Sequence, residues 1–119
     1  MRRPDAAIRL LGLAARAGTI VPGTAQVRQA VRAGRIRFAV VAADASANSR
    51  EKLLPLLTAR RVRFVVAFDR EALGRAVGRA PLSAVGLTDE RLAERVAELL
   101  SGPEEGSGGE RAGSGGRAE

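Results

Sequence analysis

The chain alternates between stretches in which apolar residues recur every three or four positions and short stretches in which they are nearly continuous. The first spacing is typical of an amphipathic helix, and the second of a strand that is covered on both faces. The pattern predicts helices over residues 5–18, 24–34, 48–61, 70–77 and 88–100 and strands over residues 19–21, 36–43, 62–68 and 82–87. Residues that can accept hydrogen bonds from the free amides of a helix start are expected to cap these helices, at Asp5, Thr24, Asn48, Asp69 and Thr88.

The strand Phe38-Ala39-Val40-Val41-Ala42-Ala43 shows no alternation of apolar and polar residues, which indicates a central strand. Helices that alternate with such strands favour the α/β class, and we expect a three-layer α-β-α sandwich around a small, four-stranded mixed sheet. At 119 residues with 45% hydrophobic residues, the chain has room for a single aliphatic core. One domain over residues 1–100 is therefore predicted.

Residues 101–119 form a different kind of segment. They contain seven glycines and no large apolar side chain, so we expect a disordered C-terminal tail. The tail holds four Glu and two Arg, a net charge of −2, whereas the whole chain carries +7. The folded part is therefore the basic part, with a formal charge of +9.

The helix predicted over residues 24–34 has one apolar and one polar face. Val27, Ala30, Val31 and Gly34 share the face expected to meet the core. The opposite face carries Ala25, Arg28, Gln29 and Arg32, with Gln26 at its margin in the first turn. Amide and guanidinium donors thus stand beside a helix end that is already partly positive, and such a surface suits a polyanion.

Absent residue types exclude several functions. The chain contains no Cys and no His, which removes disulfides, thiolate nucleophiles, Cys/His metal sites and His-based acid–base catalysis. The turn at Gly23 lacks the Gly-Lys-Ser/Thr ending of a phosphate loop, and the Gly74 and Gly78 pair indicates close helix packing or a helix end. We therefore predict a protein without catalytic activity, cofactor or metal. The N-terminal apolar run is too short to span a bilayer, so a cytoplasmic location is expected.

Five motifs, in order along the chain, carry a resemblance to a known family. They are Leu10-Leu11-Gly12-Leu13-Ala14-Ala15-Arg16-Ala17-Gly18, Val21-Pro22-Gly23-Thr24-Ala25-Gln26-Val27, Ala42-Ala43-Asp44-Ala45-Ser46-Ala47-Asn48, Leu73-Gly74-Arg75-Ala76-Val77-Gly78-Arg79 and Leu87-Thr88-Asp89. Together they resemble the bacterial YlxQ-like branch of the ribosomal protein L7Ae/L30e family, over roughly residues 5–100.

This resemblance implies an α-β-α sandwich that binds kink-turn RNA, beside the ribosome or the transcription machinery, and we expect a monomer. In the family, a Gly-x-x-Glu/Gln turn and the helix that it opens meet tandem sheared G·A pairs, and a small apolar loop covers a splayed-out nucleotide. By position, the first set of contacts falls on Gly23, Thr24, Ala25, Gln26 and Gln29, with Arg28 and Arg32 as further cations on the same helix. The loop falls on Ala80, Pro81, Leu82, Ser83 and Ala84.

The sequence departs from the family pattern at four positions. Thr19 and Gln29 stand where Lys is usual, Ala25 stands where the ribosomal members have Asn, and Ala43 stands where Glu precedes the Asp. Two of these changes remove a cation from the expected RNA face, and Arg28 and Arg32 are candidates to compensate. The alternative function is therefore a protein-interaction module of the same fold with only non-specific RNA affinity. An accessory domain in RNA modification is a third hypothesis, which no catalytic motif supports.

Overall fold

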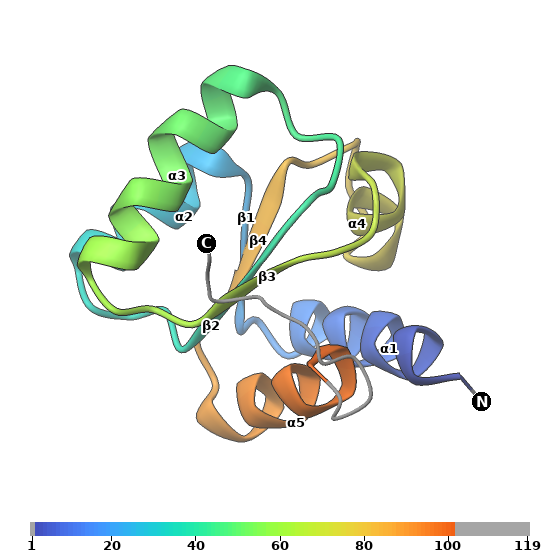
Figure 1. Cartoon of the computed structure of the whole chain (residues 1–119). Helices are drawn as coiled ribbons and strands as arrows, with labels where there is room; N and C mark the ends of the chain where they lie inside the picture. Colours follow the sequence, from blue (N-terminus) through green and yellow to red (C-terminus); the bar gives the residue numbers. More distant parts are fainter. Residues whose placement is uncertain (1, 102–119) are drawn as a thin grey trace.

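The structure is a computed structural model that describes residues 2–101, and the segment expected to be a disordered tail lies outside the described residues apart from Ser101. Five helices and four strands alternate along the chain, as the sequence predicts (Figure 1). The helices are α1 (Arg3–Arg16), α2 (Thr24–Arg32), α3 (Ala47–Ala59), α4 (Arg70–Ala76) and α5 (Glu90–Leu100). The strands are β1 (Ile20–Pro22), β2 (Phe38–Val41), β3 (Phe64–Val66) and β4 (Ala84–Leu87).

The four strands form one mixed sheet in the order β1-β4-β2-β3. Strand β4 pairs antiparallel with both of its neighbours, β1 and β2, whereas β2 and β3 are parallel. All four residues of β2 are buried, which confirms the prediction of a central strand. Because β1, β2 and β3 all run in the same direction, the turns that follow them lie along one edge of the sheet, and the turns that precede them lie along the opposite edge.

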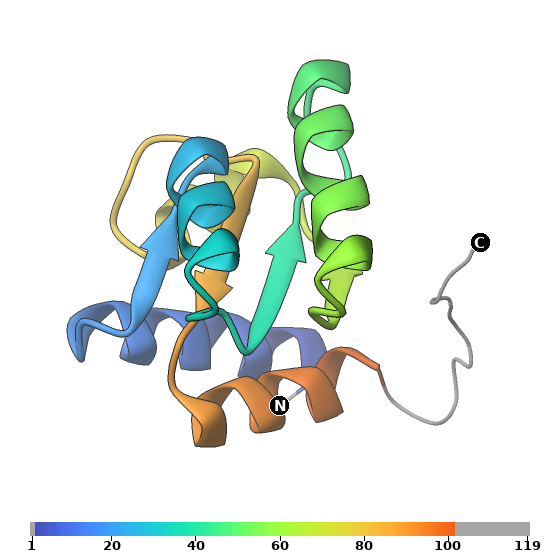
Figure 2. The ribbon, with the colours of Figure 1, turned by 90° about the vertical axis from the view of Figure 1, so that its left-hand side faces the viewer.

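Helices cover both faces of the sheet, as expected for a three-layer sandwich. Figures 1 and 2 show α2 and α3 on one face and α1, α4 and α5 on the other. The buried side chains are all apolar within residues 2–101; Phe38 is the largest, followed by Leu residues such as Leu11, Leu53 and Leu57. Burying each of these Leu side chains contributes on the order of 1.5–3 kcal/mol, so the fold rests on aliphatic packing. Within residues 2–101, no helix is long and apolar enough to cross a membrane.

The helix starts differ from the sequence-based expectation at four of the five helices. Helix α1 begins at Arg3, so Asp5 lies inside its first turn and does not cap it. Helix α2 is capped by Gly23, and Thr24 is its first helical residue. For α3 and α5 the cap lies at a neighbouring polar residue, because Ser46 accepts from the Ser49 amide at 3.1 Å and Asp89 accepts from the Leu92 amide at 2.9 Å. The predictions of Asn48 and Thr88 as caps are therefore wrong.

Other local predictions are confirmed. Asp69 caps α4 by accepting from the Ala72 amide at 2.8 Å. Val27, Ala30 and Val31 form the buried face of α2. Gly34, which we expected on that face, is exposed instead, because α2 has already ended and Gly34 adopts the left-handed conformation with φ 74°.

Candidate nucleic-acid interface

Two of the predicted segments, the Gly23 turn and the loop before β4, meet at one edge of the molecule although they lie far apart in the sequence. The Gly23 amide donates to the carbonyl oxygen of Ala84 at 2.9 Å. On its other side the loop is joined to the end of β2, because the Ala42 amide donates to the Ser83 carbonyl at 2.8 Å. We call this place, formed by residues 23–29 and 78–83, the Gly23 edge.

Gly23 has a backbone conformation that is nearly restricted to glycine, with φ 96° and ψ 152°. A β-carbon there would lie 3.9 Å from Leu82 Cδ2, so the turn passes close to the loop. Because the cap residue has no side chain, no side-chain oxygen accepts from the first amides of α2. The first turns of α3, α4 and α5 each have such an acceptor, from Ser46, Asp69 and Asp89. Helix α2 thus keeps its amides and positive dipole end open to an anionic partner.

The residues of α2 that face away from the core divide into an exposed group and a half-buried group. Ala25, Gln26 and Gln29 are exposed, and the two glutamines lie three positions apart on one helix face. Arg32 is also exposed. These four residues are accessible to a large ligand, as the sequence predicts.

Thr24 and Arg28 are less exposed than the other polar residues of α2. The Thr24 hydroxyl donates to the Ser49 hydroxyl of α3 at 3.0 Å, so it links two helices. Arg28 follows one turn later on the same helix face and is half-buried, and its Nε is buried without a hydrogen-bond partner among the described residues. Arg28 is therefore less accessible to a ligand than the sequence pattern indicates.

The loop that precedes β4 is folded onto α4. The Leu82 amide donates to the Arg70 carbonyl at 3.1 Å, and Gly74 lies directly against the backbone of Arg79 and Ala80. Ala80 and Pro81 are exposed, and Leu82 and Ser83 are half-buried. Ala84 was predicted as part of the loop, but it is the first residue of β4 and its side chain is fully buried. Its contribution to the edge is its carbonyl oxygen.

Two arginines that the sequence pattern does not single out lie at the start of α3 and α4. Arg70 lies 3.6 Å from an Asp44 carboxylate oxygen, and its amide donates to the same side chain at 2.8 Å. Arg50 donates to the Ala43 carbonyl at 3.3 Å. Both follow strands that run parallel to β1, so they belong to the same edge of the sheet as Gly23. The regular order of strands and helices is the signal that could have identified them.

Thr19, where the family pattern has Lys, does not lie at this edge. It precedes β1, whereas Gly23 follows β1, and its hydroxyl donates to the Ala14 carbonyl at 3.2 Å. Of the two positions where Lys is usual in the family, only Gln29 therefore falls within the Gly23 edge. Among the described residues, no cluster of acidic side chains could hold a metal ion.

An open edge of helix amides, glutamines and arginines on a small three-layer domain defines the class of nucleic-acid-binding α/β proteins. The chain belongs to the Ribosomal protein L7Ae/L30e/S12e/Gadd45 family, whose sequence model matches residues 5–97. The resemblance identified in the sequence is thus confirmed.

Individual relatives agree with this assignment. The chain is 32% identical to the RNA-binding protein YlxQ of Bacillus subtilis over 91 residues, which cover 76% of this chain and 91% of that protein. A solved structure of a Bacillus halodurans protein of unknown function has 32% identity and a TM-score of 0.76, over 80% of this chain and 96% of its own. A 15.5kD RNA binding protein of Giardia lamblia has 25% identity and a TM-score of 0.68, over 82% and 83% of the two chains.

Proposed function

We propose that this chain is a non-catalytic RNA-binding protein that recognises a kink-turn or a similarly kinked RNA at the Gly23 edge. The observation that carries the proposal is the Gly23–Ala84 hydrogen bond, because it joins the turn that opens α2 to the loop before β4. These are the two segments that the family resemblance implies in RNA contact. The names of the relatives from Bacillus subtilis and Giardia lamblia support RNA as the partner.

Each part of the edge has a separate role in this proposal. The open amides of α2 donate hydrogen bonds to the RNA backbone or to a purine edge, and Gln26 and Gln29 hydrogen-bond purine edges of the sheared pairs. Gly23 lets the backbone approach the RNA closely, while exposed Ala80 and Pro81 and half-buried Leu82 offer an apolar surface to an unstacked base. Arg32 lies beyond the edge, at the C-terminal end of α2, and contacts phosphate there.

A titration of the full chain with a kink-turn duplex and with a straight duplex of equal length and composition tests this function. Binding to the kinked RNA should be at least tenfold tighter, since shape-specific recognition requires a clear difference between the two. Equal, weak binding to both duplexes would contradict the proposal and favour the protein-interaction module.

The cellular setting is a further part of the proposal. From the family resemblance we infer a cytoplasmic location, beside the ribosome or the transcription machinery. Co-purification from cells, with and without ribonuclease treatment, separates the two functions. Partners held through RNA should be lost after digestion, whereas an interaction module would retain them.

A further inference from the structure

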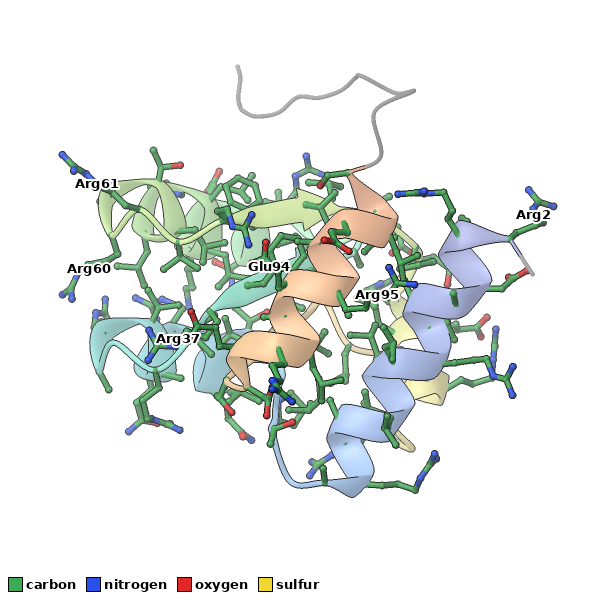
Figure 3. All side chains as sticks on the ribbon, turned by 90° about the horizontal axis from the view of Figure 1, so that it is seen from below. Arg2, Arg37, Arg60, Arg61, Glu94 and Arg95 are labelled. Atoms are coloured by element: carbon green, nitrogen blue, oxygen red, sulfur yellow. The ribbon has the colours of Figure 1, made fainter. Side chains whose placement is uncertain are left out.

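A second basic surface lies at the opposite edge of the sheet from Gly23. The turn from α2 into β2 carries Arg37, and the turn from α3 into β3 carries Arg60, Arg61 and Arg63. Because β2 and β3 are parallel neighbours, the two turns are brought side by side, and the Ala39 amide donates to the Arg63 carbonyl at 3.1 Å. Figure 3 shows Arg37, Arg60 and Arg61 together on one side of the molecule.

The four arginines surround an open groove of about 360 Å³, which we call the arginine groove. Its lining also includes apolar residues from both turns and from α2, namely Val31, Ile36 and Val62. A groove that is open to solvent and surrounded by guanidinium groups suits an extended anion better than a small enclosed ligand.

Few acidic groups offset this charge. Arg63 pairs with Glu94 at 3.1 Å and lies over the Phe38 ring at 5.8 Å from the ring centre. Arg37, Arg60 and Arg61 form no ion pair with any residue in the described part of the chain. Arg60 donates to the Arg32 carbonyl at 3.2 Å and so satisfies a free carbonyl group at the end of α2. Among the described residues, Arg37 and Arg61 make no such bond to a helix end.

The backbone at Arg61 is a second, independent observation. Four helices end in the same pair of backbone hydrogen bonds, in which the residue after the cap adopts positive φ. In α1, α2 and α4 that residue is glycine, at Gly18, Gly34 and Gly78, whereas in α3 it is Arg61 with φ 58°. A left-handed arginine is strained where glycine would not be, so the chain keeps a guanidinium group beside the groove at a cost in stability.

We propose that the arginine groove binds the phosphate backbone of a second, double-stranded RNA segment, distinct from the RNA at the Gly23 edge. The inference rests on the proposed function only because its ligand is RNA. Guanidinium groups bind phosphates through paired hydrogen bonds, and evenly spaced phosphates match a row of arginines.

Features of the chain favour a duplex over a single strand. Proteins that bind single strands stack the bases on exposed aromatic rings. The chain has no Trp or Tyr, Phe38 beside the groove is buried, and the other two rings, Phe64 and Phe68, are half-buried. Contacts in the groove are thus restricted to charge and backbone. The groove and the Gly23 edge lie at opposite ends of α2, about 13 Å apart for nine helical residues at ~1.5 Å each, so they are separate sites.

The test measures straight-duplex binding by the full chain in the presence of one equivalent of unlabelled kink-turn RNA, which occupies the Gly23 edge without an excess of its stems to compete for the groove. The double variant Arg37→Gln with Arg61→Gly should weaken duplex binding about tenfold at low salt and should reduce the salt slope by about two. Arg2→Gln with Arg95→Gln removes the same charge away from the groove (Figure 3) and should have little effect. Arg60 and Arg63 are left intact because they make structural contacts.

Three results would overturn this inference. The two double variants could weaken binding equally, which would indicate only an effect of net charge, or the groove variant could bind as tightly as the parent. The groove variant could also lose a protein partner in cells while it binds duplex RNA normally, which would assign the groove to an acidic protein. Failure of the kink-turn preference would contradict the proposed function alone, because the straight duplex needs no kink.

A second measurement uses the unaltered chain. Phenylglyoxal modifies accessible arginines, and mass spectrometry identifies the modified positions. A straight duplex should protect Arg37, Arg60 and Arg61 and leave Arg2 unprotected. Equal reactivity of the groove arginines with and without duplex would contradict the proposal, even if the double variant failed to fold.

Discussion

Gly74 lies so close to the carbonyl group of Ala80 that a β-carbon on Gly74 would overlap it. This contact fixes the loop of the Gly23 edge against α4. We predict that Gly74→Ala lowers the free energy of unfolding by about 1–3 kcal/mol, because backbone must move to make room. Alanine favours a helix over glycine by up to about 1 kcal/mol, but that gain is smaller than the clash. Thermal melting measures the change, and an unaltered melting temperature would show that the loop moves freely.

The start of α3 gives a second prediction. Ser46→Ala should destabilise the protein by about 1 kcal/mol, because it removes the acceptor of the Ser49 amide. Asn48→Ala, at the cap that the sequence alone favours, should leave the stability nearly unchanged or slightly raised, since alanine is a better helix former. Urea unfolding of both variants measures the difference. A larger loss for the Asn48 variant would contradict the cap at Ser46.

A third prediction concerns the RNA contacts of helix α2. A bidentate contact to a base edge is worth about 1–3 kcal/mol, so Gln26→Ala should reduce affinity for kink-turn RNA about tenfold to a hundredfold and leave the salt slope unaltered. Arg32→Ala should weaken binding to kinked and straight RNA alike and make the salt slope shallower. Calorimetric titration at several salt concentrations distinguishes the two variants. Unaltered binding by a folded Gln26 variant would place the RNA elsewhere.

The left-handed residue after α3 provides a fourth prediction. Arg61→Gly should raise the free energy of unfolding by about 1 kcal/mol, because glycine adopts φ 58° without a side-chain clash. For a domain of about 100 residues this corresponds to roughly 4–8 °C in melting temperature. Arg35→Gly, at the neighbouring turn where φ is not positive, is the control and should not stabilise. A lower melting temperature for the Arg61 variant would refute the interpretation of strain.

The order of helices and strands, the buried strand β2 and the face of α2 that contains Val27, Ala30 and Val31 could all be predicted from the sequence. These features follow from local apolar spacing, which a single pass along the chain reveals. The helix caps were less predictable, because several polar residues compete at each start. Thr88 and Asp89 are adjacent, and only the geometry of the Leu92 amide decides in favour of Asp89.

The two basic surfaces depend on contacts between distant segments of the chain, which local sequence patterns do not predict. The sequence-based resemblance placed Gly23 and Ala84 in one site, but their contact depends on the strand order β1-β4-β2. Similarly, Arg37 and Arg61 belong to different turns, and only the parallel pairing of β2 with β3 brings those turns together. Arg28 illustrates the opposite case, since helix periodicity predicts an open face for it, whereas its side chain is half-buried.

The central position of β4 has a consequence for how the protein is made. Strands β1 and β2 are synthesised early, yet neither pairs with the other, because β4 lies between them in the sheet. A nascent chain whose β4 is still inside the ribosome therefore lacks the pairing of β4 with β1 and with β2. It also lacks the hydrogen bond from Gly23 to Ala84. The edge that we propose for RNA is completed only when residues 84–87 have emerged, so the protein cannot engage a kinked RNA before nearly its entire domain has been translated.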